Sequence, residues 1–197
     1  PACEFRAEDV SCQDGVLRFT MIWPEGRCTV QTASQGEHNV TNALAAAACG
    51  WLLGLDADEL ADGLAAYQPV GMRERRYEKN GFTIYEDCYN ASPDSMEAAL
   101  RALHDMPGGH KIAVLGGMGE LGDYAPEGHR RAGRAAAQYA DRVLAYGANT
   151  EYLCEGALQA GMNEQAVQCY PSHETLVQAL REIAQPGDVL LFKGSRA

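Results

Sequence analysis

The feature that most constrains this chain is a regular alternation, from about residue 80 onward, of short apolar segments with longer amphipathic ones. The apolar segments have the length and composition of β-strands, at 82–86, 111–115, 142–146, 166–170 and 188–192. Helices are predicted between them, from Ser92-Pro93 onward and at 126–140, 151–160 and 172–184. Short strands that alternate with helices are typical of a parallel sheet with helices on both faces. The sequence therefore predicts an α/β fold with a doubly wound parallel sheet.

The first 72 residues follow a different pattern and are predicted to form a separate domain. Two strands, 16–22 and 28–32, flank a turn and indicate a β-hairpin at the edge of something larger. A helix is expected from near Asn39 to Gly54, and a second one follows Asp56, which has the capping-box spacing to Glu59. The predicted domains are residues 1–72 and 73–197. Both termini read as cut, so we expect a part of a longer protein.

The charge of the chain limits its partners. The net charge is −11 and the pI is about 4.8, whereas nucleic acid and anionic membranes require a basic surface. An anionic small ligand remains compatible with this balance. No apolar run spans a bilayer and no signal peptide opens the chain. Seven scattered cysteines without a C-x-x-C pair favour free thiols in the cytoplasm over a disulfide framework or a zinc site.

Ligands of a doubly wound sheet bind outside the carboxyl ends of its strands, here segments 87–93, 116–122, 147–149, 171–174 and 193–196. Segment 116–122 contains four glycines, which indicate either close approach to a ligand or an ordinary flexible loop. Asp87 could accept hydrogen bonds from a ribose or an ammonium group, or it could, like Ser92, only cap a turn or a helix. Lys193, Ser195 and Arg196 form either an anion clamp or a solvated tail.

A second candidate site lies at the start of the helix in the first domain. Asn39 and Asn42 lie three residues apart, so their amides project from one side and could read the edge of adenine. Alternatively, Asn39 is a helix cap, Asn42 a surface residue and His38 a structural histidine. The histidines show no metal-ligand spacing, no metal site is expected, and His129 and His173 are predicted to face solvent. No P-loop sequence is present, so the residues alone predict a two-part α/β protein with a small-molecule site.

Four motifs resemble those of the Mur ligase family, in the expected order and spacing. They are GEHNVTNALAAA at 36–47, DCYNASPDSM at 87–96, LGGMGELG at 115–122 and KGSR at 193–196. The second motif is similar to the signature of the family member that adds D-alanyl-D-alanine. The resemblance covers essentially the whole chain. It implies the β-hairpin and helical end of the central ATP-binding domain, followed by most of the Rossmann-like carboxy-terminal domain.

The resemblance implies an ATP-dependent amide ligase of peptidoglycan precursor synthesis. ATP phosphorylates the terminal carboxylate of UDP-N-acetylmuramoyl-tripeptide, and the amine of D-alanyl-D-alanine then attacks the acyl phosphate. The UDP-binding domain, the P-loop and the Mg²⁺ ligands of such an enzyme are expected outside this chain. The protein is expected to be a cytoplasmic monomer that binds neither nucleic acid nor a membrane.

The resemblance also implies roles for individual residues. Nucleotide binding is assigned to His38, Asn39 and Asn42 at the adenine, Asp87 at the ribose, and Arg73 at the phosphates, where its charge would stabilise the transferring phosphoryl group. Substrate binding is assigned to residues of the strand-end loops: Tyr89, Asn90, Ser92, Met118, Glu120 and Lys193.

The motifs depart from the family pattern in two loops. Gly117 stands where the D-alanyl-D-alanine-adding member usually has an aspartate, and Cys88 and Ser92 replace a serine and an asparagine. Without the P-loop and the Mg²⁺ ligands, this chain alone is expected to be inactive. Two alternatives remain: another amide ligase of the superfamily, amino-acid-adding or folylpolyglutamate synthase-like, and a non-catalytic Rossmann-like binding module.

Overall fold

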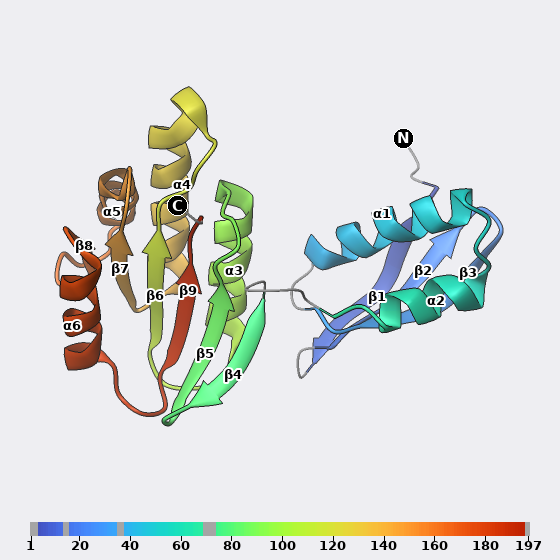
Figure 1. The fold of residues 1–197 in the computed structure, drawn as a ribbon, viewed down its shortest axis with the longest axis horizontal. Coiled ribbons are helices and arrows are strands. Elements are labelled where there is room, and N and C mark those ends of the chain that lie inside the picture. Colours follow the sequence, from blue (N-terminus) through green and yellow to red (C-terminus); the bar gives the residue numbers. More distant parts are fainter. Residues whose placement is uncertain (1–3, 14–15, 35–37, 69–73, 196–197) are drawn as a thin grey trace. The chain divides into compact units, whose positions relative to one another are not determined.

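The computed structural model describes residues 4–13, 16–34, 38–68 and 74–195 of the chain (Figure 1). The chain divides into two compact units, residues 1–70 and 71–197. Arg73, to which the family resemblance assigns the nucleotide phosphates, lies outside the described residues, as does Arg196 of the predicted anion clamp.

The described part of the first unit is an antiparallel sheet covered by two helices (Figure 1). Its elements are β1 (Arg6–Gln13), β2 (Val16–Trp23), β3 (Gly26–Thr32), α1 (His38–Leu52) and α2 (Ala57–Ala65). In β2 every second residue from Leu17 to Trp23 is buried, so one face of the sheet forms the core with the helices. Val40 and Ala47 of α1 and Leu60 of α2 complete this core.

The predicted hairpin corresponds to β2 and β3, but it is incomplete because β1 pairs with β2 as a third strand. Most side chains of β1 are exposed, so its sequence lacks the apolar alternation that identifies a strand. The predicted capping box is confirmed. The Asp56 carboxylate accepts hydrogen bonds from the backbone of α2, and the Glu59 carboxylate accepts one from the Asp56 backbone at 3.0 Å.

The second unit contains a six-stranded sheet in the order β4-β5-β9-β6-β7-β8. The strands are β4 (Arg75–Lys79), β5 (Phe82–Asp87), β6 (Lys111–Gly116), β7 (Arg142–Tyr146), β8 (Val167–Tyr170) and β9 (Val189–Lys193). The helices are α3 (Pro93–Asp105), η1 (Gly122–Tyr124), α4 (Ala125–Tyr139), α5 (Thr150–Gln159) and α6 (His173–Ile183). All strand pairs are parallel except β4 with β5. The predicted α/β class and its alternation of strands and helices are confirmed.

Helices cover both faces of this sheet (Figure 1). On one face α3, α4 and α5 enclose the larger core, which includes Leu100, Leu115 and Leu191. On the other face α6 packs through Leu176 against Ile112 and neighbouring strand residues. The helix α3 begins as predicted, with Ser92 as its N-cap and Pro93 in the first turn.

The antiparallel edge strand β4 was not predicted from the sequence. Its side chains are mostly exposed and charged, so its sequence shows neither an alternation of apolar with polar residues nor a continuous apolar run. The turn that joins it to β5 is Asn80-Gly81, with φ of 53° and 81°. An Asn-Gly pair between two β segments is a strong hairpin signal, and it is the local feature that predicts this strand.

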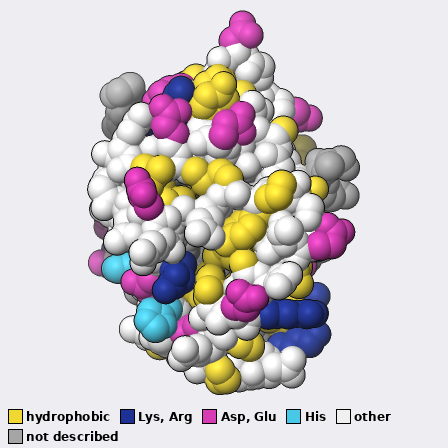
Figure 2. Space-filling model, turned by 90° about the vertical axis from the view of Figure 1, so that its left-hand side faces the viewer, with side chains coloured by type: hydrophobic (Ala, Val, Ile, Leu, Met, Phe, Trp, Pro, Cys, Tyr) yellow, Lys and Arg dark blue, Asp and Glu magenta, His cyan; other side chains and the backbone are white. Residues whose placement is uncertain are grey.

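Two predictions about individual side chains are wrong. Cys154 of α5 and Cys169 of β8 form a disulfide, whereas free thiols were predicted; Cys12, Cys28, Cys49 and Cys88 are free among the described cysteines. The sequence did not predict this disulfide because the two cysteines are 15 residues apart and meet only through the packing of α5 on β8. His129 is fully buried rather than exposed. On the face in Figure 2, a central run of hydrophobic side chains lies among acidic ones, with Lys, Arg and His side chains beside its lower part.

Candidate functional site

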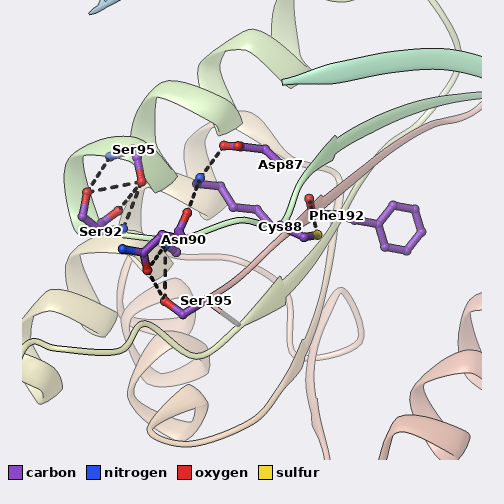
Figure 3. A network of polar contacts seen from close by, with 9 residues as sticks. Asp87, Cys88, Asn90, Ser92, Ser95, Phe192 and Ser195 are labelled. Atoms are coloured by element: carbon purple, nitrogen blue, oxygen red, sulfur yellow. Dashed lines mark hydrogen bonds and ion pairs between the residues drawn. The ribbon is translucent and has the colours of Figure 1, made fainter. Parts of the chain in front are cut away.

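The carboxyl ends of β5, β9 and β6 lie next to one another, because β9 pairs with both of the other strands. Three segments that are far apart in sequence therefore meet at one edge of the sheet: 88–92 after β5, 117–121 after β6 and 194–195 after β9. Figure 3 shows the polar contacts between the segments that follow β5 and β9. We call the polar contacts among Asp87, Asn90, Ala91, Lys193, Ser195 and loop residues 117–119 the strand-end network.

A buried ion pair lies at the base of the strand-end network. Asp87 and Lys193 are partners in the parallel pairing of β5 with β9, and the Lys193 ammonium contacts the Asp87 carboxylate (Figure 3). The Lys193 side chain is 1% exposed and that of Asp87 is 14% exposed. Lys193 Nζ also donates to the Asn90 carbonyl oxygen at 3.3 Å. Lys193 is therefore neither a solvated tail nor a cation that projects freely toward a ligand.

Ser195 connects all three segments of the network, and Figure 3 shows its contact with Asn90 in the segment after β5. Its Oγ donates a hydrogen bond to Asn90 Oδ1 at 2.9 Å. The same oxygen accepts bonds from the backbone N–H of Gly119 at 3.0 Å and of Ala91 at 3.3 Å. The backbone N–H of Ser195 donates to the Gly117 carbonyl oxygen at 3.1 Å. One hydroxyl thus fixes the 88–92 segment relative to the glycine-rich loop.

Glycines allow the backbones of these segments to approach closely. A Cβ added to Gly194 would lie 2.9 Å from the Cα of Gly116 on the neighbouring strand. A Cβ added to Gly117 would lie 2.5 Å from the carbonyl oxygen of Ala148, in the connection after β7. Any side chain at position 117 therefore requires the Ala148 segment to move, which accounts physically for glycine at this position in this chain.

The segment after β5 carries the predicted substrate residues Tyr89, Asn90 and Ser92. Tyr89 and Asn90 are exposed, and Asn90 takes part in the Ser195 contacts. Ser92 Oγ accepts from Ser95 N at 3.3 Å as the N-cap of α3, so a structural role for it is present. Burial, together with the nearby Glu86 and Asp87 carboxylates, raises the pKa of the Cys88 thiol, which donates to the Phe192 carbonyl oxygen at 3.2 Å.

The glycine-rich loop presents one of its two predicted substrate residues to solvent. The Glu120 side chain is exposed, and its backbone has a φ of 60°, which is unusual for a residue other than glycine. The Met118 side chain is 4% exposed and packs in the larger core. Only the backbone of Met118 therefore lies at the site, because its thioether is enclosed by core residues.

His129 of α4 contacts this loop from beneath. Its Nε2 accepts a hydrogen bond from the Met118 N–H at 3.0 Å, and its Nδ1 lies 2.7 Å from the Ala125 carbonyl oxygen. It shares the apolar stripe of α4 with the buried Ala132 and Ala136. That spacing is the sequence signal that would have predicted its burial. His173, by contrast, is exposed as predicted.

The asparagines of the first unit meet as their spacing predicts. Asn42 Nδ2 donates to Asn39 Oδ1 at 2.9 Å. Both residues line a cavity of about 360 Å³ between α1 and α2, whose wall includes Ala43, Leu60 and Tyr67. His38 is the first residue of α1, and its side chain lies outside the described part of the chain. The first unit therefore holds paired amides at the rim of a largely apolar cavity.

The described ranges contain neither a metal-binding cluster nor a helix that could cross a membrane. Among residues 4–13, 16–34, 38–68 and 74–195, no group of three or more His, Cys, Asp or Glu side chains could hold a metal ion. Within the same ranges, none of the helices has both the length and the apolar character needed to cross a membrane.

Comparison with known proteins relates most of the chain to one family. Residues 72–196 match a sequence model described as "Mur ligase, glutamate ligase domain". The UDP-N-acetylmuramoyl-tripeptide–D-alanyl-D-alanine ligase of Bacillus subtilis is 37% identical over 196 residues, which cover 98% of this chain and 42% of that relative. The chain therefore spans less than half the length of this relative.

Solved structures agree with this relationship. A crystal structure of MurF from Acinetobacter baumannii has a TM-score of 0.84 and 29% identity, covering 98% of this chain and 42% of that one. The MurF ligase of Thermotoga maritima, solved in complex with ADP, has a TM-score of 0.77 and 26% identity, covering 98% of this chain and 43% of that one. Both relationships extend over the two units of the chain.

Proposed function

The chain belongs to the Mur ligase family, and from this premise we propose that it is part of the ligase that joins D-alanyl-D-alanine to UDP-N-acetylmuramoyl-tripeptide. The observation that supports this most is its 37% identity to a D-alanyl-D-alanine ligase across 98% of the chain. The proposed ligase acts in the cytoplasm as a monomer and consumes ATP. In the proposed reaction a carboxylate is first phosphorylated, and the dipeptide amine then displaces phosphate from the acyl phosphate.

The rim of the first-unit cavity suits an adenine ring. The Asn42 amide already donates to Asn39, and its own carbonyl oxygen is the group suited to accept from an exocyclic amine. The apolar wall formed by Ala43 and Leu60 offers a surface for the flat ring. We propose that Asn39, Asn42 and His38 contact the adenine of ATP. The ADP bound to the Thermotoga maritima ligase is consistent with a nucleotide site in this family.

Asp87 is the proposed ribose ligand of the second unit. Its carboxylate is held by Lys193, and an orienting partner of this kind fixes the direction of the remaining acceptor positions. Lys193 would therefore act by holding Asp87 rather than by touching a substrate phosphate. Arg73 is proposed to neutralise charge on the phosphates, as a guanidinium does in phosphoryl transfer.

The exposed residues of the strand-end network are proposed to line the peptide site. Tyr89 and Asn90 follow β5, and Glu120 belongs to the loop that Ser195 fixes to them. A carboxylate such as that of Glu120 suits the ammonium group of an incoming dipeptide. Ser92 and Met118 would contribute through the shape of their segments, because Ser92 caps α3 and Met118 is buried.

We propose no Mg²⁺ ligand within the described residues, none of which form a suitable cluster. The metal and the P-loop would belong to the part of the ligase that this chain does not include. When bound, the metal would neutralise charge on the phosphates. The chain by itself is accordingly expected to release no phosphate.

The proposal can be tested on the complete ligase by following phosphate release from ATP with UDP-N-acetylmuramoyl-tripeptide. D-Alanyl-D-alanine would be compared with single amino acids as acceptors, in the wild type and in Asp87→Asn, Arg73→Ala and Asn42→Leu; asparagine keeps an oxygen for the buried Lys193 ammonium. Asp105→Asn, at an exposed carboxylate at the end of α3, is the matched control for Asp87→Asn.

The expected result is release that requires the dipeptide and falls at least about tenfold in the Asp87 and Arg73 variants, as loss of one charge-assisted hydrogen bond predicts. The fall in Asn42→Leu should be smaller, because the hydrogen bond it loses is uncharged. The control should retain wild-type rates. Release driven by a single amino acid would assign the protein to a different ligase of the superfamily. Absence of release with every acceptor would contradict the proposal and favour a binding module.

A further inference from the structure

The glycine-rich loop is held through the backbone of three consecutive residues. The Gly117 carbonyl oxygen accepts from Ser195 N at 3.1 Å, and Gly119 N donates to Ser195 Oγ at 3.0 Å. Between them, Met118 N donates to His129 Nε2 at 3.0 Å. Ser195 therefore holds the loop from the side of the sheet, and His129 holds it from the side of α4.

The two contacts of His129 define one protonation state. Because Nε2 accepts the Met118 N–H, it carries no proton, and the ring proton lies on Nδ1. Nδ1 then donates to the Ala125 carbonyl oxygen, 2.7 Å away in the first turn of α4. The ring is fully buried, so solvent does not compete for either nitrogen. His129 is thus a neutral bridge between the loop and the start of the helix that follows it.

This bridge restrains a backbone conformation that would not persist by itself. Glu120 has a φ of 60°, a left-handed value that is unfavourable for a residue with a Cβ and is kept only where the surroundings fix it. The residues just before Glu120 are those held by His129 and Ser195. After it, Leu121 packs against the core, where a Cβ on Gly128 would lie 2.9 Å from its Cδ1.

We propose that His129 is a positioning residue that sets the direction of Glu120 for an amine-bearing substrate. His129 itself reaches no surface and touches no ligand, so its effect passes through Met118 N to the exposed end of the loop. The assignment of the amine to the dipeptide acceptor rests on the proposed function. The restraint of the loop by His129 does not depend on that function and can be measured separately.

The first test uses this chain and measures amide hydrogen exchange and the histidine ¹⁵N spectrum by NMR. His129→Leu removes both polar contacts at similar volume, whereas His129→Gln keeps one donor and one acceptor. His173→Leu is the matched control, because that histidine is exposed. The wild-type His129 should show the Nδ1-protonated neutral tautomer. The Met118 amide should exchange about tenfold faster in His129→Leu, as expected for one lost hydrogen bond.

The amide of Leu191 in the central strand β9 separates local from global effects. Faster exchange at Met118 with unchanged exchange at Leu191 supports the restraint. An unchanged rate at Met118, or equal acceleration at both amides, overturns it. His129→Gln should lie between the wild type and His129→Leu.

The second test uses the complete ligase and compares KM with kcat. His129→Leu should raise KM for D-alanyl-D-alanine about tenfold, the equivalent of one lost hydrogen bond to the amine, with a much smaller change in kcat. The KM of His129→Gln should be close to that of the wild type. The double variant Glu120→Gln/His129→Leu should have a KM only slightly higher than that of either single variant. An unchanged KM in His129→Leu overturns the positioning role. So does an increase in KM of the same size whether residue 120 is Glu or Gln, because the effect of His129 would then not pass through Glu120. A wild-type ligase that does not use the dipeptide instead contradicts the proposed function and leaves the exchange result standing.

Discussion

Removing either member of the Lys193–Asp87 ion pair should destabilise the second unit, and the two losses should differ in size. Breaking a buried pair by removing one partner typically costs about 3–5 kcal/mol, because the remaining charge stays buried without its partner. The Lys193 side chain is 1% exposed, whereas that of Asp87 is 14% exposed. Water can therefore reach a solitary Asp87 carboxylate but not a solitary Lys193 ammonium.

The decrease in the free energy of unfolding can be estimated for each variant from this difference in exposure. Lys193→Met leaves the more accessible charge and should cost about 3 kcal/mol, at the lower end of the range for buried pairs. Asp87→Ala leaves the enclosed ammonium, with the Asn90 carbonyl oxygen at 3.3 Å as its other contact, and should cost closer to about 5 kcal/mol. The double variant should cost less than the sum of the two, because it leaves no unpaired charge.

Urea unfolding provides the assay, since Trp23 and Trp51 are the two tryptophans of the chain and both belong to the first unit. Tryptophan fluorescence then follows the first unit and should not change, while far-UV circular dichroism reports the loss in the second. Arg101→Met is the control, because the Arg101 side chain is 55% exposed in its ion pair with Glu97. Such pairs contribute at most about 1 kcal/mol. Losses no larger than the control, or a larger loss in Lys193→Met than in Asp87→Ala, would refute the reasoning.

Three further predictions concern stability. Cys154→Ser, or reduction of the Cys154–Cys169 bond, should lower the free energy of unfolding by about 3 kcal/mol, the value for a loop of roughly 15 residues; identical urea curves with and without reductant would contradict this. Gly117→Ala should cost about 1–3 kcal/mol by forcing the backbone apart, whereas Gly119→Ala, whose added Cβ meets Ser195 at ordinary contact distances, should unfold at nearly the wild-type urea concentration. Burial raises the pKa of the Asp188 carboxyl, but hydrogen bonds from neighbouring backbone amides and a histidine outweigh it and leave the pKa lowered. Its stabilisation is therefore present above the ordinary aspartate pKa and is lost as the pH falls through the lowered one. Asp188→Asn should accordingly flatten the acid side of a plot of stability against pH, and an unchanged acid side would argue against this role.

Much of the fold follows from local patterns in the sequence. The alternation of apolar strands with amphipathic helices predicts the α/β class, and the Ser92-Pro93 and Asp56–Glu59 pairs predict where two helices begin. Even the unpredicted strand β4 has a local signal in Asn80-Gly81. These features succeed because capping, turn chemistry and periodicity depend on residues within a few positions of one another.

The location of the candidate site also follows from the sequence, once the strands are identified. Asp87, Gly116 and Lys193 each end a strand, and parallel strands bring such residues to one edge of the sheet. The spacing of Asn39 and Asn42 similarly predicts that their amides meet, as they do at 2.9 Å. Periodicity does not predict the state of each side chain at that edge, that is, whether it is buried, paired or exposed.

That state depends on which strands become neighbours. Strand β9 lies between β5 and β6, so Lys193 meets Asp87 across 106 positions of sequence and is a buried partner rather than an exposed cation. The packing of α4 against the glycine-rich loop likewise makes His129 the acceptor of the Met118 N–H, a contact that the helical spacing of His129 does not specify. The sequence by itself determined most of the elements, their order and the edge of the sheet at which the candidate site residues lie, because those depend on local backbone preference and on the direction of parallel strands. Only the tertiary structure decided which charges and rings are removed from water, because burial depends on contacts between residues distant along the chain.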